Sequence, residues 1–294
     1  MSQFFLQQGY SGELDKFPHV KEFALKKNST IQFGSFTPIV SDTLRIYYIV
    51  DGKFEWLINH HHHTLYPGDI VLVLPGQEIG GSKGYLDIGS LFSLHIGIEK
   101  IDHTKGMTLG KWSTLSDTER VLIGKILLNN MLVLRAKGVA DILHEVRAEI
   151  LNQELGYFTR INHLIDSLLI IIARQTTQHE SSRRDFPKTF MKLEQTLRQN
   201  LAHQWTVEEM AALFGLSTTA FTEKVKSYTG FSPLNYLINI RISEAIKQLK
   251  RSDVKVTNIA LETGFYSSQH FSTTFKKLTG YTPGEFRKIN TSGN

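Results

Sequence analysis

Two segments near the C-terminus of this 294-residue chain carry hydrogen-bonding side chains and lysines at matching positions. Hydroxyl, amide and carboxylate groups can pair with base edges in the major groove of DNA, and lysines beside them can neutralise phosphates. The pattern therefore predicts two recognition helices for double-stranded DNA, over residues 218–228 and 268–278. The candidate DNA-binding residues are Thr218, Thr219, Thr222, Glu223 and Lys226 in the first segment, and Ser268, Gln269, Ser272, Thr273, Lys276 and Lys277 in the second.

The opposite side of each predicted helix is apolar. At 100° per residue, three apolar residues share one face in each segment. They are Phe221, Val225 and Tyr228 in the first segment and Phe271, Phe275 and Leu278 in the second. The two segments are copies, because FTEKVKSYTGFSP at 221–233 recurs as FSTTFKKLTGYTP at 271–283; upstream, the offset between the copies is one residue shorter. The repeat predicts a duplicated structural unit, with one extra turn residue in the second copy.

Local signals place a short helix and a tight turn before each recognition helix. In the first copy, Thr206 and Glu209 have the spacing of a capping box, and Gly215 ends the short helix that follows. Ser217 is the next expected N-cap and Gly230 the expected C′ glycine. The second copy repeats this order with a helix over Thr257–Thr263, then Gly264, a helix over Ser267–Leu278 and Gly280. This order predicts two helix-turn-helix units.

A further predicted helix joins the two units. Ser232 and Pro233 provide a cap followed by an N1 proline, and an apolar stripe extends from there to Lys250. Such a helix would be about 27 Å long, and successive major-groove faces lie about 34 Å apart. One chain could therefore read two neighbouring grooves. The stripe consists of Leu234, Leu237, Ile238, Ile242, Ala245, Ile246 and Leu249.

The N-terminal part has a different pattern. Between residues 31 and 100, short apolar stretches alternate with Gly and Pro turns, which predicts an all-β barrel or sandwich. The clearest strands are 45–50, 54–58 and 70–74. From about residue 115, apolar residues recur three or four apart, beginning with Leu122, Ile126, Met131 and Leu134, which predicts helices. The polar segment 174–187 is the expected linker.

Charge and cysteine content separate the two parts further. Residues 181–294 carry 16 basic and 9 acidic side chains, whereas residues 1–180 carry 17 and 19. The basic C-terminal part favours a polyanionic partner. Without cysteine the chain has no disulfide, no thiolate metal site and no cysteine nucleophile. Because neither a signal-peptide pattern nor an apolar run of about 20 residues occurs, we expect a soluble, cytoplasmic protein with no membrane partner.

The last hundred or so residues resemble the DNA-binding domain of the AraC/XylS family of bacterial transcription regulators. The matching stretches are TVEEMAALFGLS at 206–217, TGFSPLNYLINIRISEA at 229–245 and VTNIALETGFYSSQHFSTTFKKLTGYTPGEFR at 256–287. The resemblance implies that the second helix of each unit enters the major groove. It carries base readout onto Thr219, Thr222, Glu223, Gln269, Ser272 and Thr273. Many family members have arginine where this chain has Glu223 and Thr273, so the commonest guanine contact is absent.

The N-terminal part resembles the cupin-type sensor domain of many such regulators, on the stretch IYYIVDGKFEWLINHHHHTLYPGDIVLVLPGQEI at 46–79. Residues 142–175 resemble the helices that pair two chains. The resemblance implies an α+β fold: a cupin-like β-barrel over about 1–112 and helices over about 115–175 in one domain, 1–180, and an all-α domain, 188–290, with two helix-turn-helix units joined by a long helix. It implies operator DNA, a small-molecule effector, a second copy of the chain and RNA polymerase as partners, and no cofactor.

Two N-terminal features have competing interpretations. His60 to His63 could ligate a metal, but consecutive strand residues alternate faces. The places of the ligands in metal-binding cupins hold Ile39, Ser41, Arg45 and Ile79, so we expect no metal site. Arg45 could bind an anionic effector inside the barrel, and the alternative is a surface or ion-paired strand residue.

The sequence also bears on the pairing of two chains and on catalysis. The apolar stripe at 161–172 is expected to form a dimer seam, although it could instead cover the barrel. No phosphate loop, GxSxG or HExxH occurs, so we expect no enzyme and no catalytic residue. The rival functions are a ligand-independent DNA-binding regulator whose barrel only dimerises, and a cupin enzyme with a DNA-binding tail.

Overall fold

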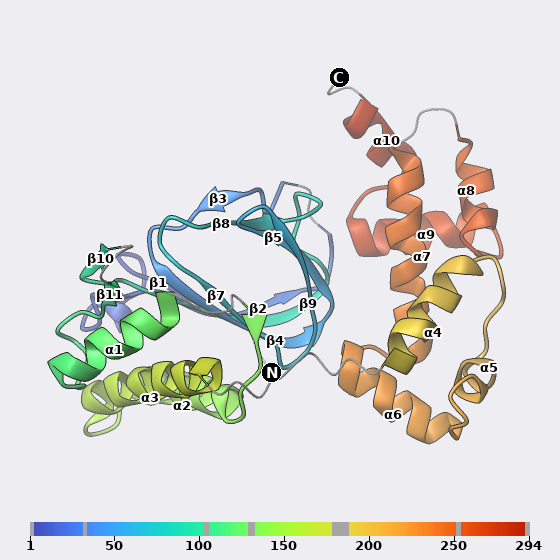
Figure 1. Ribbon diagram of the computed structural model, residues 1–294. Helices are drawn as coiled ribbons and strands as arrows, with labels where there is room; N and C mark the ends of the chain where they lie inside the picture. Colours follow the sequence, from blue (N-terminus) through green and yellow to red (C-terminus); the bar gives the residue numbers. More distant parts are fainter. Residues whose placement is uncertain are drawn as a thin grey trace. The chain divides into compact units, whose positions relative to one another are not determined.

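The computed structural model describes residues 3–31, 34–102, 106–128, 133–177, 188–250 and 254–291. The chain divides into two compact units. The first consists of Met1–Lys27, Phe36–Gly84 and Gly89–Arg183, and the second of Asn28–Ser35, Tyr85–Ile88 and Arg184–Asn294. The first unit begins with strands and ends with helices, and the C-terminal part of the second is helical (Figure 1). The predicted α+β fold class is confirmed.

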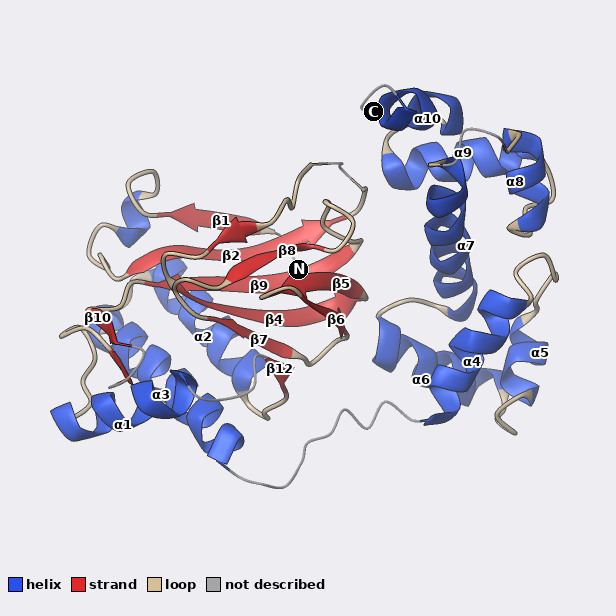
Figure 2. Ribbon diagram, turned by 45° about the horizontal axis from the view of Figure 1, so that its top comes forward, coloured by secondary structure: helices blue, strands red, loops and turns tan. Residues whose placement is uncertain are grey.

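Two antiparallel sheets form most of the first unit (Figure 2). In spatial order, the larger sheet consists of β1 (Phe4–Gln7), β2 (Val20–Asn28), β9 (Gly89–Ile96), β4 (Leu44–Gly52), β7 (Ile70–Val73) and β12 (Val133–Leu134). The smaller sheet consists of β3 (Ile39–Val40), β8 (Glu78–Gly81), β5 (Phe54–Ile58) and β6 (His61–Leu65). A 3-10 helix (Gly12–Leu14) and the pair β10 (Lys100–Asp102) and β11 (Gly106–Thr108) also occur. The three clearest predicted strands correspond to β4, β5 and β7.

Three helices of the described residues pack on one face of the larger sheet: α1 (Asp117–Leu128), which precedes β12, and α2 (Val139–Asn152) and α3 (Tyr157–Thr177), which follow it. One hydrophobic core joins this face to the helices and includes Ile46 and Leu94 from the sheet and Leu143 from α2. Because successive strand residues point to opposite faces, Arg45 and Tyr47 point away from the helices, into the space between the two sheets.

The apolar stripe of α3 belongs to this core. Its residues Ile161, Ile165, Leu168, Leu169 and Ile172 are fully buried within the single chain. The predicted dimer seam at 161–172 is therefore wrong, and the stripe covers the sheet instead. Helical periodicity shows that one face of a helix must be covered, but it does not show by which surface.

Two smaller expectations about this region are also wrong. Leu134 was expected on a helix, but it lies on β12, paired with Ile70 of β7. The expected linker began at residue 174, but α3 continues to Thr177. A short strand and a helix end are both poorly defined by apolar spacing alone. Met131 and the rest of the expected linker lie outside the described residues.

The described residues of the C-terminal part of the second unit form seven helices: α4 (Lys188–Gln199), α5 (Val207–Ala212), α6 (Thr218–Thr229), α7 (Pro233–Leu249), α8 (Val256–Glu262), α9 (Ser268–Thr279) and α10 (Pro283–Thr291). The predicted repeat of short helix, turn and long helix is α5–α6 and α8–α9, and α7 is the predicted joining helix. This agreement follows from strong caps and glycine turns at both copies.

Helix α7 contributes to two separate hydrophobic cores. Tyr236, Leu237 and Ile240 pack with α4, α5 and α6, whereas Ile242 and the apolar residues after it pack with α8, α9 and α10. Leu234, which the predicted stripe included, is 46% exposed. It lies in the first turn of α7 and belongs to neither core, so this part of the prediction is wrong.

Candidate nucleic-acid interface

The two recognition helices start and end with the same devices. At their N-termini, Ala220 N–H donates to Ser217 Oγ at 3.3 Å, and His270 N–H donates to Ser267 Oγ at 3.1 Å. Both helices end at a left-handed glycine, Gly230 (φ 76°) or Gly280 (φ 80°). These bonds satisfy donors that a helix end otherwise leaves unpaired. The expected caps are confirmed.

A buried threonine closes each recognition helix in the same way. Thr229 Oγ1 donates to Val225 O at 2.8 Å and accepts from Phe231 N–H at 3.1 Å. In the second copy, the hydroxyl of Thr279 forms the matching bonds to Phe275 and Tyr281. The repeat therefore extends from sequence to individual hydrogen bonds, and it holds the exit of both helices in one geometry.

The apolar sides of α6 and α9 face the two cores as predicted. Phe221 and Val225 are buried in the first core, and Phe271 and Phe275 in the second. Leu278 is half-buried at the edge of the second core, and the side chain of Tyr228 lies outside the described residues. Because these contacts set the rotation of each helix, they also determine which residues face solvent.

The predicted DNA-binding residues lie on the other side of both helices. Most are exposed: Thr218, Thr219, Glu223 and Lys226 on α6, and Gln269, Thr273, Lys276 and Lys277 on α9. Thr222, Ser268 and Ser272 are half-buried. Each helix therefore brings its predicted set together on one accessible side.

The extra residue of the second copy is Tyr266, which the sequence interpretation did not select. Leu216 N–H donates to Ala211 O in the first unit, and Phe265 N–H donates to Ala260 O in the second, so these two residues correspond. Tyr266 follows this shared turn and is 76% exposed, directly before the N-cap of α9. An aromatic residue inserted into one of two otherwise matching repeats was the sequence signal that could have found it.

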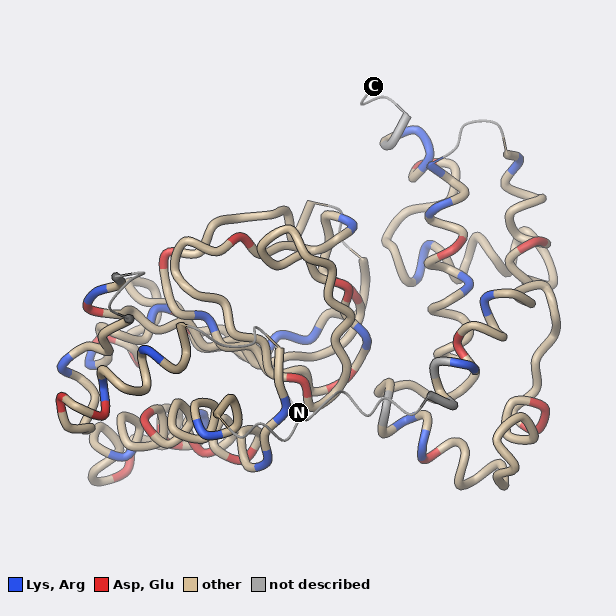
Figure 3. Tube along the Cα trace, viewed as in Figure 1, with Lys and Arg blue, Asp and Glu red and all other residues tan. Residues whose placement is uncertain are grey.

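The charges on the two helices differ (Figure 3). α9 carries Lys276 and Lys277 and no acidic residue, whereas α6 carries Glu223 directly before its basic residues Lys224 and Lys226. Within the described part of the chain, Glu223 has no ion-pair partner. Its carboxylate is free to accept a hydrogen bond from a cytosine amino group, but phosphate would repel it.

Two carboxylates in this unit are held by backbone amides at helix starts. Thr206 and Glu209 form the predicted capping box before α5, with Thr206 N–H donating to Glu209 Oε2 at 2.9 Å. Thr282 N–H donates to Glu285 Oε2 at 2.7 Å before α10. These backbone hydrogen bonds lower the pKa of both carboxyl groups.

Arg45 lies between the sheets of the first unit, in a polar cluster on strands β2, β4 and β9. Its side chain is 12% exposed and lies 3.7 Å from Asp42. On the same face, His95 Nε2 lies 3.1 Å from Tyr47 Oη and 3.2 Å from Ser93 Oγ. The ring of Tyr47 meets Trp56 of the smaller sheet edge-on at 5.0 Å. Two buried donors in this cluster have no hydrogen-bond partner: Arg45 Nε and Trp56 Nε1.

Burial controls the protonation of this cluster. It lowers the pKa of His95 to about 4 and raises the pKa of Tyr47 to about 12, so both side chains are uncharged at neutral pH. Burial also acts to raise the pKa of Glu22, but His95 and the ammonium of Lys26, 2.7 Å away, outweigh it, and the pKa is lowered. Glu22 is therefore ionised at neutral pH, beside the two uncharged side chains.

The histidine run lies on the edge strand β6 and in the turn before it. His60 Nδ1 is 3.1 Å from Glu78 Oε2, and His61 Nδ1 is 2.8 Å from the carbonyl oxygen of Asn59. Among the residues that the structure describes, no group of three histidine, aspartate or glutamate side chains could hold a metal ion. None of the described helices is long and apolar enough to cross a bilayer.

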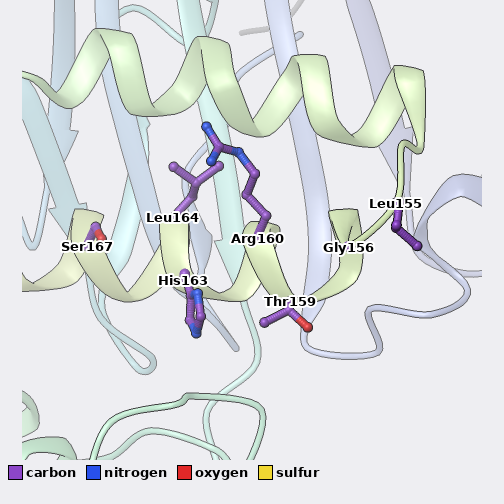
Figure 4. Close-up of a pocket in the computed structure, with 7 residues that line it drawn as sticks. All are labelled: Leu155, Gly156, Thr159, Arg160, His163, Leu164 and Ser167. Carbon is purple, nitrogen blue, oxygen red and sulfur yellow. The ribbon is translucent and has the colours of Figure 1, made fainter.

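The outward side of α3 carries an open pocket of about 440 Å³. Figure 4 shows its residues at the start of α3 and in the loop before it, with Arg160 reaching toward α2. Arg160 forms ion pairs with Glu145 at 2.8 Å and Glu149 at 2.6 Å. Leu155 beside it is fully exposed. The lining residues are Leu155, Gly156, Thr159, Arg160, His163, Leu164 and Ser167.

Comparisons with known proteins agree with this architecture. Residues 210–289 match a family model described as a helix-turn-helix domain. The HTH-type transcriptional activator RhaS of Mannheimia succiniciproducens is 26% identical over 239 residues, which cover 80% of this chain and 83% of that protein. An AraC-like transcription regulator of Streptomyces antibioticus is 34% identical over 92 residues, which cover 31% of this chain and 30% of that protein.

One similar solved structure is the DNA-binding domain of AdpA, a global transcriptional factor, in complex with a target DNA. It is 28% identical, covers 35% of this chain and 94% of that chain, and has a TM-score of 0.34. The duplicated, identically capped units and the relatives they match point to the same kind of protein. The chain is therefore a DNA-binding transcription regulator similar to those of the AraC type, and its C-terminal helices form the helix-turn-helix domain.

Proposed function

We propose that α6 and α9 read bases in successive major grooves of one operator. The observation that carries this proposal is the matched pair of accessible polar sides on two helices with equal caps and equally buried apolar sides. Lys226, Lys276 and Lys277 contact phosphates, where each neutralised charge releases counterions. Selection of binding sites from random DNA by the full chain should return two base blocks. A single block, or no enrichment, would contradict the proposal.

Glu223 gives the first block a testable base preference. A carboxylate accepts a hydrogen bond from cytosine N4, so the base that Glu223 reads should be cytosine. The variant Glu223→Gln, which can also donate, should lose this preference and shift toward adenine. Site selection with both proteins compares the first block directly, and the unchanged second block serves as the internal control.

We further propose that the polar cluster around Arg45 binds a small anionic effector with oxygen acceptors. Support comes from the buried donors Arg45 Nε and Trp56 Nε1, because a buried donor without a partner is costly and a ligand oxygen would satisfy it. A ligand that binds the folded state raises stability by mass action. In a panel of small carboxylates, one compound should raise the melting temperature of the wild type and of Lys27→Ala, but not of Arg45→Ala. An equal shift in all three proteins would exclude Arg45.

The homodimer stays part of the proposal, on a different surface from the buried stripe. The outward side of α3 offers the open pocket and the exposed residues Leu155 and Phe158 beside it. Burying such apolar surface favours association. Sedimentation at micromolar concentration should show a dimer that Leu155→Asp dissociates, whereas a monomeric wild type would count against pairing.

We propose that the protein acts in the cytoplasm and catalyses no reaction. The transcription regulators to which it is similar support this proposal. RNA polymerase is a proposed partner of the operator-bound dimer. The effector acts by binding the two arrangements of the dimer with different affinity, since only differential binding can shift a conformational equilibrium. An effector that stabilises the protein but leaves operator affinity unchanged would exclude this role.

A further inference from the structure

The two helix-turn-helix units have separate hydrophobic cores, and α7 is the helix that contributes to both. The last buried α7 residue of the first core is Ile240, and the first buried α7 residue of the second core is Ile242. Between them lies Arg241, which is buried at 7% exposure. A buried charge in a helix that joins two cores requires an explanation, because its desolvation is costly unless hydrogen bonds compensate.

Arg241 connects α7 to the turn that follows α4 in the first unit. Its Nε donates to the carbonyl oxygen of Leu201 at 3.2 Å, and its Nη2 donates to that of His203 at 2.7 Å. Within the described residues, no carboxylate pairs with it. Burial lowers its pKa, yet guanidinium stays charged at neutral pH. The balancing partial charges are carbonyl oxygens beyond the C-terminal end of α4, where a cation is favourable.

The turn of the second unit contacts the same place. Gly264 is the glycine between α8 and α9, with φ +81°. A Cβ at this position would overlap the carbonyl oxygen of Leu201 and the guanidinium of Arg241. Gln204 Nε2 donates to the carbonyl oxygen of Gly264 at 3.0 Å. The turn after α4 and the turn of the second unit are therefore in direct backbone contact, with Arg241 against both.

From this geometry we infer that Arg241, Gln204 and Gly264 form a polar joint that sets the operator spacing this protein accepts. This inference rests on the proposed base reading by α6 and α9. Arg241 is a positioning residue, since it is buried away from the exposed sides of both recognition helices. A planar guanidinium bridging two carbonyl groups resists rotation of one unit about α7, whereas a single donor would not.

The joint can be tested without DNA. Because the chain has no cysteine, Lys224→Cys and Lys277→Cys place two spin labels selectively, one on α6 and one on α9. Double electron–electron resonance then measures the distribution of distances between the two spin labels, and hence between the two units. Arg241→Lys and Gln204→Ala should each broaden this distribution. Lys247→Met, which removes an exposed cation of α7 at an ion pair with Glu244, should leave it unchanged. Unchanged widths in both joint variants overturn the inference.

Gln204→Ala protects this test against a folding defect, because Gln204 is exposed and removing its side chain leaves both cores intact. If Arg241→Lys fails to fold, Gln204→Ala alone decides. Its helical circular dichroism and melting curve should match those of the wild type.

The functional test measures affinity for the selected operator and for the same operator with one base pair inserted between its two blocks. Insertion misplaces the contacts of one unit, so the wild type should lose about tenfold or more in affinity, on the scale of one or two mismatched base pairs. In Arg241→Lys and Gln204→Ala the loss should fall to about threefold or less.

The outcomes separate the inference from the proposed function. A broadened distance distribution with an unchanged insertion penalty would overturn the claim that the joint sets spacing. If the wild type selects only one block, or has no insertion penalty, the proposed reading by two helices fails, whatever the joint does. If the distance distributions of both variants keep the wild-type width and the wild type selects a two-block operator, only the inference about the joint is refuted.

Discussion

The first and second helix-turn-helix units share their framework and differ in their outward sides. Serine caps, left-handed glycines and buried threonines occupy the same places in α6 and α9. Outside, α6 has Glu223 among its basic residues, whereas α9 has two lysines, no acidic residue and the inserted Tyr266 before it. The comparison teaches that caps and core fix a recognition helix in place, while its exposed side is free to diverge. We expect the second helix-turn-helix unit to bind DNA more strongly than the first.

The largest effects should come from the cores, where the two units should respond separately. Phe221 and Phe271 are both buried, one in each core. Replacing either by alanine should cost about 3–5 kcal/mol of stability, because a cavity remains. Hydrogen exchange should report lost protection mainly in α5 and α6 for Phe221→Ala, and in α8 and α9 for Phe271→Ala. Equal loss in both units for either variant would show one cooperative core instead.

Base reading should be the next largest difference. Gln269→Ala should weaken operator binding by about 1–3 kcal/mol, because an amide can form a bidentate pair with adenine. Thr219→Ala, at the matching outward position of α6, should cost less, since a hydroxyl forms a single bond. Titrations with the operator and with random DNA measure both. The assignment of α9 fails if Gln269→Ala loses affinity equally on the two DNAs.

A smaller effect should appear in salt dependence. Lys276 is exposed on α9 and should contact a phosphate, so Lys276→Ala should weaken binding to all sequences alike. The slope of log affinity against log salt should fall by about 0.9 for the lost contact. Glu223→Gln serves as the contrasting variant, because it removes a negative charge and should strengthen binding to random DNA. An unchanged slope in Lys276→Ala would place this lysine away from the backbone.

The smallest effect concerns the capping carboxylates. The pKa of Glu209 is lowered by its bond from Thr206 N–H, so the ionised form stabilises the fold above the ordinary value of 4.5. This contribution is lost as the pH falls through the lowered value. Melting curves of Glu209→Gln should lie below those of the wild type at pH 7 and converge with them below pH 4.5. A constant difference across this range would exclude the capping role. Glu285 offers the same test before α10.

Local signals in the sequence were sufficient to predict both helix-turn-helix units and the helix that joins them. Both recognition helices, the cap at Thr206 and the long helix from Pro233 follow from residue types at fixed spacing, and each has a physical cause within one helical turn. Contacts between distant residues left no such signal. Arg241 reads as one cation in an apolar helix, and its partners Leu201 and His203 lie about forty residues upstream.

The N-terminal unit with the two sheets was harder to predict for the same reason. Turn residues placed β4, β5 and β7, but the stripe of α3 gave no indication that the sheet covers it. Arg45 was singled out by its position alone. The neighbours that make it a candidate site, Tyr47 and Trp56, come from two different sheets and meet only after folding. Strand pairing of this kind depends on long-range contacts that periodicity does not encode.

The second core also has a consequence for synthesis on the ribosome. Its last member is Phe286 of α10, which is fully buried and meets Phe275 edge-on at 5.6 Å. The first core needs nothing beyond Ile240. In a nascent chain, the first helix-turn-helix unit can therefore fold before α10 has been synthesised, whereas the second unit can fold only afterwards. We expect a chain that ends between α9 and α10 to fold only its first helix-turn-helix unit. Such a chain should bind half of the proposed operator and compete with the complete protein for it.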